Sequence, residues 1–170
     1  MIRAFKWGII TALCVTVWLF GMFTLLNSLS LQAPKATLRT LTGALGLVVL
    51  FIGILLGMKS VRGKFETGKF DYAMAFGAGI IITLIVALTV SLVSFLYAKW
   101  INPSLAEDMV KEAASSLKAA GTGVEETAKK LESVRNEFSP RSQLLAPLIV
   151  QTIVGSLFSI ILAFFLRNKK

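Results

Sequence analysis

The chain has 170 residues, of which 55% are hydrophobic, and its mean hydropathy of +0.76 is too high for an ordinary soluble domain. Its 18 lysines and arginines outnumber 9 acids and give a net charge of +9, but these cations gather at the ends of apolar runs and do not alternate with aromatic residues. We therefore expect a membrane protein whose cations meet lipid headgroups, and no binding of nucleic acid.

Four apolar runs reach or come close to the length of about 20 residues that crosses a hydrocarbon core of about 30 Å. They are Trp7–Leu31, Leu41–Met58, Met74–Ala98 and Leu144–Leu166. None of them contains Asp, Glu, Lys, Arg or His. The second run is the shortest, and snorkelling of the flanking Arg39 and Lys59 would let it span. The pattern predicts an all-α membrane protein in which four transmembrane helices form one domain over residues 1–170.

The lysines and arginines near the spans predict the orientation of the chain. With the N-terminus inside, nine lie on the cytoplasmic side and four outside. The inner set is Arg3, Lys6, Lys59, Arg62, Lys64, Lys69, Arg167, Lys169 and Lys170, and the outer set is Lys35, Arg39, Lys99 and Arg141. Because such residues accumulate in cytoplasmic segments, we expect both termini in the cytoplasm and residues 99–143 on the opposite side.

The segment between the third and fourth spans differs from the rest of the chain, because residues 104–138 hold seven of the nine acids. Ser104 stands three residues before Glu107, and Thr122 three before Glu125, which is the spacing of a helix capping box. Gly121 suits the end of the first helix, and Ser139-Pro140 the end of the second. We expect a water-exposed helical hairpin, residues 104–138, inserted between spans 74–98 and 144–166.

Each helix of this hairpin has one modest apolar stripe beside a charge-balanced face. Glu125 precedes Lys129, and Glu126 precedes Lys130, in the favourable order for ion pairs along a helix. One interpretation is a plain connector, in which the stripes pack on each other or lie along the membrane surface. The other is a docking surface for a partner or a second copy. The candidate residues for such contacts are Leu105, Met109, Leu117, Val124, Leu131 and Phe138.

Small residues recur at every fourth position inside the spans, a pattern that lets transmembrane backbones approach closely. The candidates for span packing are Ala75, Gly79, Thr83, Ala87 and Ser91 in the third span, Gln151, Gly155, Ser159 and Ala163 in the fourth, and Gly53 and Gly57 in the second. We expect packing within one chain, with dimerisation or a partner subunit as the alternative. An unpaired amide is costly in lipid, so Gln151 is expected to face another helix and bond to it, with solute recognition as its alternative role.

The chain resembles a known family in the early "KWGII", in "GKFDYAMAFGAGIIIT" leading into the third span, and in the ending "IVGSLFSIILAFFLRNKK". The most specific run contains Gly68, Lys69, Tyr72, Ala75, Phe76 and Gly79. These features resemble the domain of unknown function 4199 family, short four-span inner-membrane proteins of Gram-negative bacteria. The resemblance implies a bacterial inner membrane, with residues 99–143 in the periplasm, and it implies no catalytic residues.

The residue types present argue against an enzyme. The chain has no histidine, one cysteine in mid-span and no carboxylate within a span, so we expect no catalytic site, metal or cofactor. Glu66 and Asp71 lie among cations in a predicted cytoplasmic turn, where ion pairing explains them. Only Pro147 interrupts a span, in what is predicted to be its first turn.

By elimination, the sequence predicts a non-catalytic membrane protein that acts through helix packing and a hairpin interaction surface. The alternative function is a small carrier or pore for a neutral or lipid-like solute. The expected partners are the lipid bilayer and either a membrane or periplasmic protein or a second copy of the chain.

Overall fold

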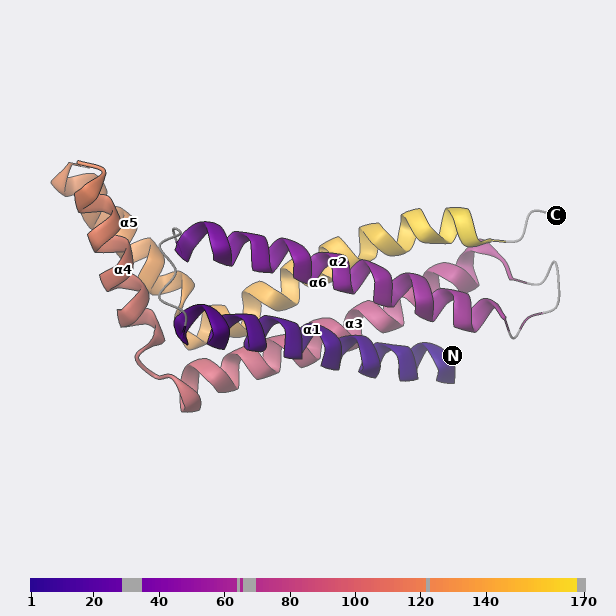
Figure 1. Cartoon of the computed structure of the whole chain (residues 1–170). Coiled ribbons are helices and arrows are strands. Elements are labelled where there is room, and N and C mark those ends of the chain that lie inside the picture. The colour runs from indigo at the N-terminus through magenta and orange to yellow at the C-terminus, as the bar shows by residue number, and fades with distance from the viewer. Residues whose placement is uncertain (29–34, 64, 66–69, 122, 168–170) are drawn as a thin grey trace. The chain divides into compact units, whose positions relative to one another are not determined.

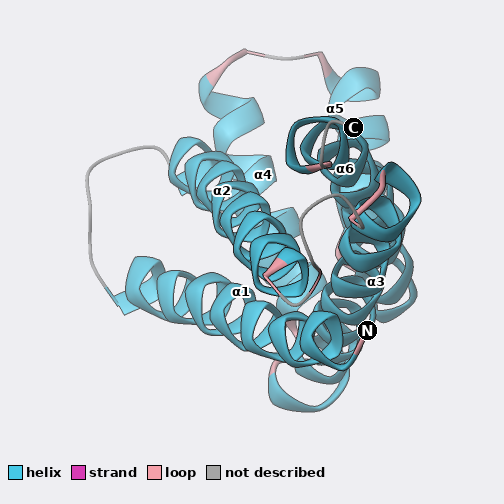
Figure 2. Cartoon of the chain, turned by 90° about the vertical axis from the view of Figure 1, so that its right-hand side faces the viewer, coloured by secondary structure: helices cyan, strands magenta, loops and turns pink. Residues whose placement is uncertain are grey.

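The chain is almost entirely helical. The computed structural model describes residues 1–28, 35–63, 65, 70–121 and 123–167, and over these it contains no strand (Figure 2). The elements are α1 (Ile2–Ser28), α2 (Lys35–Arg62), α3 (Tyr72–Leu96), a π-helical turn η1 (Tyr97–Ile101), α4 (Leu105–Ala119), α5 (Val124–Glu137) and α6 (Pro140–Leu166). The predicted all-α fold class is confirmed.

Four of these helices are long and apolar enough to cross a membrane. The qualifying stretches are Ile2–Met22, Leu41–Arg62, Tyr72–Ile101 and Pro140–Leu166. In lipid every backbone N–H and C=O must be satisfied within the chain, which a helix does by itself. The chain is therefore a multi-pass membrane protein. The helices run past the predicted limits at several ends because polar residues at a membrane surface continue a helix as readily as apolar ones do; the predicted end at Leu31 lies outside the described residues.

The chain divides into two compact units, Met1–Val90 with Ile149–Lys170, and Ser91–Leu148. In the first unit, α1 is antiparallel to α2. The portion of α3 up to Val90 is antiparallel to the portion of α6 that begins at Ile149 (Figure 1). Met1 and the end of α6 lie at the same end of this unit (Figure 1). There the Arg3 guanidinium donates a hydrogen bond of 3.0 Å to the Ser60 carbonyl oxygen, which joins the start of α1 to the end of α2.

The first unit buries a narrow core and exposes broad apolar faces. Phe51 of α2 meets Phe158 of α6 edge to face, with ring centroids 5.1 Å apart, beside the buried Ile54 and Ile82. At most 39% of the residues in the apolar window of any span are buried. Because four helices in water would not leave such faces uncovered, the exposed apolar surface is the surface that meets lipid.

In the second unit, α4 and α5 pack against each other, and Gly121 reverses the chain between them with φ +67°. Only glycine adopts this left-handed conformation at little cost, so its predicted place at the end of α4 is confirmed. The predicted pairs Glu125–Lys129 and Glu126–Lys130 are also confirmed, at 2.8 and 2.6 Å. Both pairs are exposed and contribute only a few tenths of a kcal/mol each.

The capping box predicted at Ser104 is wrong. Ser104 has φ −82° and ψ 0°, close to helical values, whereas an N-cap needs extended backbone for its hydroxyl to reach the N–H groups of the first turn. The hydroxyl bonds instead to the Asp108 carboxylate at 3.1 Å and to the Asn102 side chain at 3.0 Å. At α5 the N-cap residue is Gly123, and Thr122 lies outside the described residues.

The predicted place of Pro147 in a first helical turn is also wrong. Helix α6 already begins at Pro140, where proline is favoured because a first-turn N–H has no partner within the helix. The preceding Ser139 hydroxyl accepts the Ser142 N–H at 3.3 Å. Pro147 therefore lies in the helix interior, where it removes one backbone hydrogen bond. Close by in sequence, the Leu144 carbonyl oxygen accepts a hydrogen bond from the buried Ser91 hydroxyl of α3.

A glycine sets the separation of α1 and α2. A Cβ atom at Gly53 would lie 2.8 Å from the Thr11 Cβ, whereas one at Gly43 of the same helix would meet nothing within 4 Å. We predict that Gly53→Ala lowers the free energy of unfolding by about 1–3 kcal/mol, because the helices must separate. Gly43→Ala, the matched control, should leave it unchanged or raise it by up to about 1 kcal/mol. Detergent-induced unfolding followed by circular dichroism checks both, and equal effects would contradict the close approach at Gly53.

Candidate functional site

All eleven predicted span-packing residues are buried. They are Gly53 and Gly57 of α2, Ala75, Gly79, Thr83, Ala87 and Ser91 of α3, and Gln151, Gly155, Ser159 and Ala163 of α6. Eight of them belong to the first unit and to α3 or α6: Ala75, Gly79, Thr83, Ala87, Gln151, Gly155, Ser159 and Ala163. We call these eight residues the α3–α6 seam.

The α3–α6 seam pairs small residues in antiparallel register. A Cβ atom at Gly79 would lie 2.7 Å from the Ser159 Cβ, and one at Gly155 would lie 3.1 Å from the Thr83 Cβ. Real Cβ atoms are rarely that close, so a methyl group at either glycine would push the helices apart. Each hydroxyl-bearing residue thus fills the space that the missing side chain of a glycine leaves on the other helix.

The other candidates make contacts outside this seam. The GxxxG pair of α2 is divided between two neighbours, because Gly53 faces Thr11 of α1 while Gly57 faces Ile82 of α3 and Trp7 of α1. Ser91 belongs to the second unit, where it donates to the Leu144 carbonyl. The close contact of Gly8 with Ile85 is not among those predicted from the sequence. A signal for it exists, since Ala4, Gly8 and Ala12 are spaced by four residues and are all buried.

Several buried polar atoms in the spans have no hydrogen-bond partner within the described part of the chain. They are the hydroxyl oxygens of Thr11, Thr16 and Thr83 and the Gln151 Oε1. Gln151 is buried, with 8% of its surface exposed, but the predicted interhelical bond is not made by its side-chain oxygen. The reason is the small size of the residues opposite, because a seam of glycine and alanine brings backbone close and offers few side-chain donors.

The hairpin candidates differ in exposure. Leu105 and Met109 are buried, with 5% and 7% of their surface exposed, and so are not part of a free surface. Leu117, Leu131 and Phe138 are partly exposed, and Val124 at the start of α5 is 90% exposed. Helix α5 contains no buried residue at all. The hairpin therefore presents thin, incompletely covered apolar stripes.

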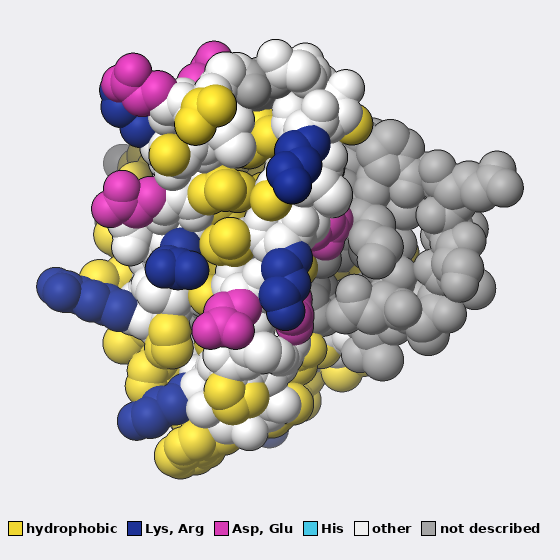
Figure 3. Space-filling model, turned by 90° about the vertical axis from the view of Figure 1, so that its left-hand side faces the viewer, with side chains coloured by type: hydrophobic (Ala, Val, Ile, Leu, Met, Phe, Trp, Pro, Cys, Tyr) yellow, Lys and Arg dark blue, Asp and Glu magenta, His cyan; other side chains and the backbone are white. Residues whose placement is uncertain are grey.

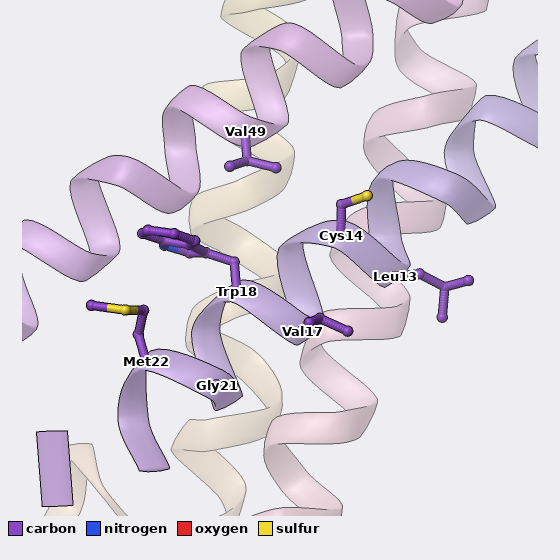
Figure 4. A pocket seen from close by; sticks show the side chains of 7 residues that line it. All are labelled: Leu13, Cys14, Val17, Trp18, Gly21, Met22 and Val49. Carbon is purple, nitrogen blue, oxygen red and sulfur yellow. The ribbon is translucent and has the colours of Figure 1, made fainter. Parts of the chain in front are cut away.

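A groove of about 600 Å³ lies between α1 and α2. It is lined by Leu13, Cys14, Val17, Trp18, Gly21, Met22 and Val49, and Trp18 and Met22 extend from α1 toward α2 (Figure 4). The indole N–H of Trp18 donates to the Thr42 carbonyl oxygen at 3.2 Å. The thiol of Cys14 is free and exposed. Apart from the Cys14 thiol, the lining is apolar and uncharged, which suits contact with hydrocarbon.

The carboxylates and Cys14 are the candidate metal-ligating or acid–base groups among the described residues. No group of three His, Cys, Asp or Glu among them is placed to hold a metal ion. Of the two carboxylates in the turn before α3, Glu66 lies outside the described residues. The Asp71 carboxylate accepts the Met74 N–H at 2.8 Å and so caps the N-terminus of α3. A capping role accounts for Asp71 without acid or base catalysis.

Comparison with known proteins gives one match. A family model described as "Protein of unknown function (DUF4199)" matches residues 6–168. Neither the curated proteins nor the solved structures give a significant match. The matched region contains all the spans except the first residues of α1, together with the hairpin. The resemblance drawn from the sequence motifs is thereby confirmed.

Removing the unpartnered oxygens of the bundle should not destabilise the fold. Thr83→Val and Gln151→Leu should leave the free energy of unfolding unchanged or raise it by about 1 kcal/mol, because each removes a buried polar atom that has no partner. Ser91→Ala, the matched control, removes a bonded hydroxyl and should lower it by about 1 kcal/mol. Chemical unfolding in micelles measures all three. A clear loss of stability in Thr83→Val would show that its hydroxyl has a partner after all.

Proposed function

We propose that this chain, which belongs to the DUF4199 family of proteins of unknown function, is a non-catalytic protein of a bacterial inner membrane that acts through contacts of its α4–α5 hairpin. The proposal concerns a multi-pass membrane protein with four spans and one helical hairpin. It assigns the spans to anchoring and the hairpin to recognition.

The exposure of the hairpin is the observation that supports this proposal most strongly. Helix α5 has no buried residue, and its first residue, Val124, is 90% exposed. The two helices have 15 and 14 residues, a length at which an isolated helix is marginal in water, and Leu105 and Met109 are the only buried residues in them. A partner that covers the remaining stripes would supply the missing burial.

The charges on the hairpin suit a protein partner better than an ion or a nucleic acid. Basic and acidic side chains are interspersed around hydrophobic ones on the face drawn in Figure 3. Both helices have acids in the first turn and a basic residue in the last. A mixed polar rim around small apolar patches is the usual composition of a protein interface. The proposed partner is a membrane or periplasmic protein, or a second copy of the chain.

The small residues of the spans support the same division of roles. Because the α3–α6 seam and the α2 glycines are buried in contacts within the chain, these stripes are already used in the fold of the monomer. They are therefore unfavourable candidates for joining two copies within the membrane. The water-exposed hairpin remains as the interaction surface.

The proposed orientation places both termini in the cytoplasm and residues 99–143 in the periplasm. It is supported by the excess of lysine and arginine near the spans on the cytoplasmic side. The exposed Trp100 and Ile101, in η1 at the end of α3, suit the boundary between hydrocarbon and headgroups. Met1 and the end of α6 at one end of the first unit agree with termini on a single side, whichever side that is (Figure 1).

A carrier of a neutral solute is the second candidate function, and the unpartnered oxygens of Thr83 and Gln151 are the observation that favours it. The close approach at Gly155 and Gly79 argues against it, because helices that leave no space for a methyl group leave none for a solute at those levels. In liposomes, flux that Gln151→Leu abolishes without unfolding the chain would favour the carrier over the contact protein.

The proposal predicts that the hairpin holds a partner. Gentle extraction from the source membrane and native mass spectrometry should find an assembly larger than one chain. That assembly should disappear when residues 104–138 are replaced by a flexible linker. The point variant Val124→Ser should weaken it about tenfold, which corresponds to the loss of roughly 1.4 kcal/mol from burial of one valine.

Two results would contradict this prediction. One is a lone monomer from both the intact and the linker chain, and the other is an assembly that survives the linker. Ser133→Ala, an exposed change on the same helix, is the matched control and should leave the assembly intact. Circular dichroism should show equal helix content for the two point variants, so that a weaker assembly reports the contact of Val124.

A further inference from the structure

A second groove lies in the first unit between the start of α3 and the end of α6. Its volume is about 340 Å³, and Tyr72, Ile160, Ile161, Phe164 and Phe165 line it. The four α6 residues are between 44% and 73% exposed, so the groove opens onto the face of the bundle that meets lipid. Its position at the end of two spans puts one mouth at the membrane surface.

A cation stands at that mouth. The Arg167 guanidinium lies over the ring of Phe164, 4.7 Å from its centroid, and Phe164 in turn meets Phe165 edge to face at 5.7 Å. Stacking on an aromatic face orients a guanidinium and leaves its N–H donors free for an anion. On the opposite wall, Tyr72 stacks on Phe76 with ring centroids 6.2 Å apart, which fixes the ring of Tyr72.

The side chains along the groove change from apolar to charged, in the same order as the acyl chain and phosphate of a phospholipid. From Ile160 to Arg167 a helix rises about 10 Å, from branched aliphatic side chains through two phenylalanines to a cation. A tyrosine at the same end adds a side chain that is apolar along its ring and polar at its hydroxyl, as is usual at the boundary of hydrocarbon and headgroups. The depth and the order match an acyl chain below and a phosphate above.

We infer that this α3–α6 groove binds one anionic phospholipid from the leaflet that it faces, with the phosphate on Arg167 and an acyl chain along Ile160, Ile161 and Phe164. The charge at the mouth argues for an anionic lipid over a zwitterionic one, because a cation near a membrane surface attracts acidic headgroups. Asp71, the carboxylate that precedes Tyr72, already accepts the Met74 N–H. Its charge is thus balanced in part by the N-terminus of α3.

The experiment measures retention of lipid by the full-length chain. The protein is placed in nanodiscs of equal parts dioleoyl phosphatidylglycerol and dioleoyl phosphatidylcholine, ejected by native mass spectrometry, and the lipids that remain bound are counted. The wild-type chain should retain phosphatidylglycerol in preference. Arg167→Gln should lower that preference about fivefold, which corresponds to about 1 kcal/mol for one cation near the membrane surface.

The chain offers a matched control. Lys99 also lies over an aromatic ring at the end of a helical stretch, 5.5 Å from the centroid of Phe95, but Phe95 does not line the groove, whereas Phe164 beneath Arg167 does. Lys99→Gln should leave the preference unchanged. Phe164→Ala, at a position that is 58% exposed, should shorten the retention of both lipids because it removes one wall of the groove.

Equal retention of the two lipids by the wild-type chain would overturn the inference. Equal effects of Arg167→Gln and Lys99→Gln would overturn it too, since they would mean that any surface cation acts alike. Lys169 and Lys170 are present in every variant, so their contribution to lipid retention is the same throughout and a change between variants reports the substituted residue. The result is independent of whether the hairpin binds a partner.

Discussion

The fold depends on how closely helices can approach in a solvent that offers them no hydrophobic drive. Lipid tails are as apolar as leucine, so transmembrane helices gain from contact only where their surfaces fit at short range. This chain achieves the fit with glycine facing hydroxyl-bearing residues, Gly155 against Thr83 and Gly79 against Ser159 on α3 and α6, and Gly53 against Thr11 on α1 and α2. The hydroxyl-bearing side chain of one helix occupies the space that glycine leaves open on the other helix.

The same constraint explains the polar atoms left without partners. Backbones brought close by glycine leave little room for side chains that could donate to Thr83 or Gln151, so tight packing and polar satisfaction compete at these positions. Contact area was favoured over hydrogen bonding in the seam. A bundle built in this way suits an anchor with a fixed interior better than a carrier that must open.

The proposed functions, membrane anchoring and partner recognition, belong to different compact units. The first, which contains most of the four spans, buries its small-residue stripes in itself and turns its large apolar side chains outward to lipid. The second contains the α4–α5 hairpin, whose apolar stripes are thin and partly exposed. Recognition is thus assigned to the part of the chain that its own packing leaves least complete, and lipid binding to a groove beside a terminal cation.

Much of this architecture can be predicted from the sequence, because a span requires a long apolar run and a charged hairpin interrupts such runs visibly. The register of α3 and α6 follows less directly: the stripes at every fourth residue predict which faces meet, but not that Thr83 lies against Gly155. The failures have local causes. The capping box does not form at Ser104 because the backbone of that residue is close to helical. Pro147 is not in a first turn because helix α6 already starts at Pro140. The groove at Tyr72 and Arg167 joins segments far apart in sequence, which no local pattern indicates.

The most direct test of the central claim, that the small-residue stripes pack within one chain, is a disulfide between Thr83→Cys and Gly155→Cys in a chain that also has Cys14→Ser and so has no other thiol. A Cβ atom at position 155 would lie 3.1 Å from that of Thr83, slightly less than the usual Cβ separation of about 3.5–4.5 Å in disulfides, so a small outward shift of the helices would allow the bond. Mild oxidation in the membrane should give a cross-linked monomer, while the pair Thr83→Cys with Leu157→Cys, off the shared face, should stay reduced. Cross-linked dimers of the first pair, or equal cross-linking of both pairs, would contradict the account.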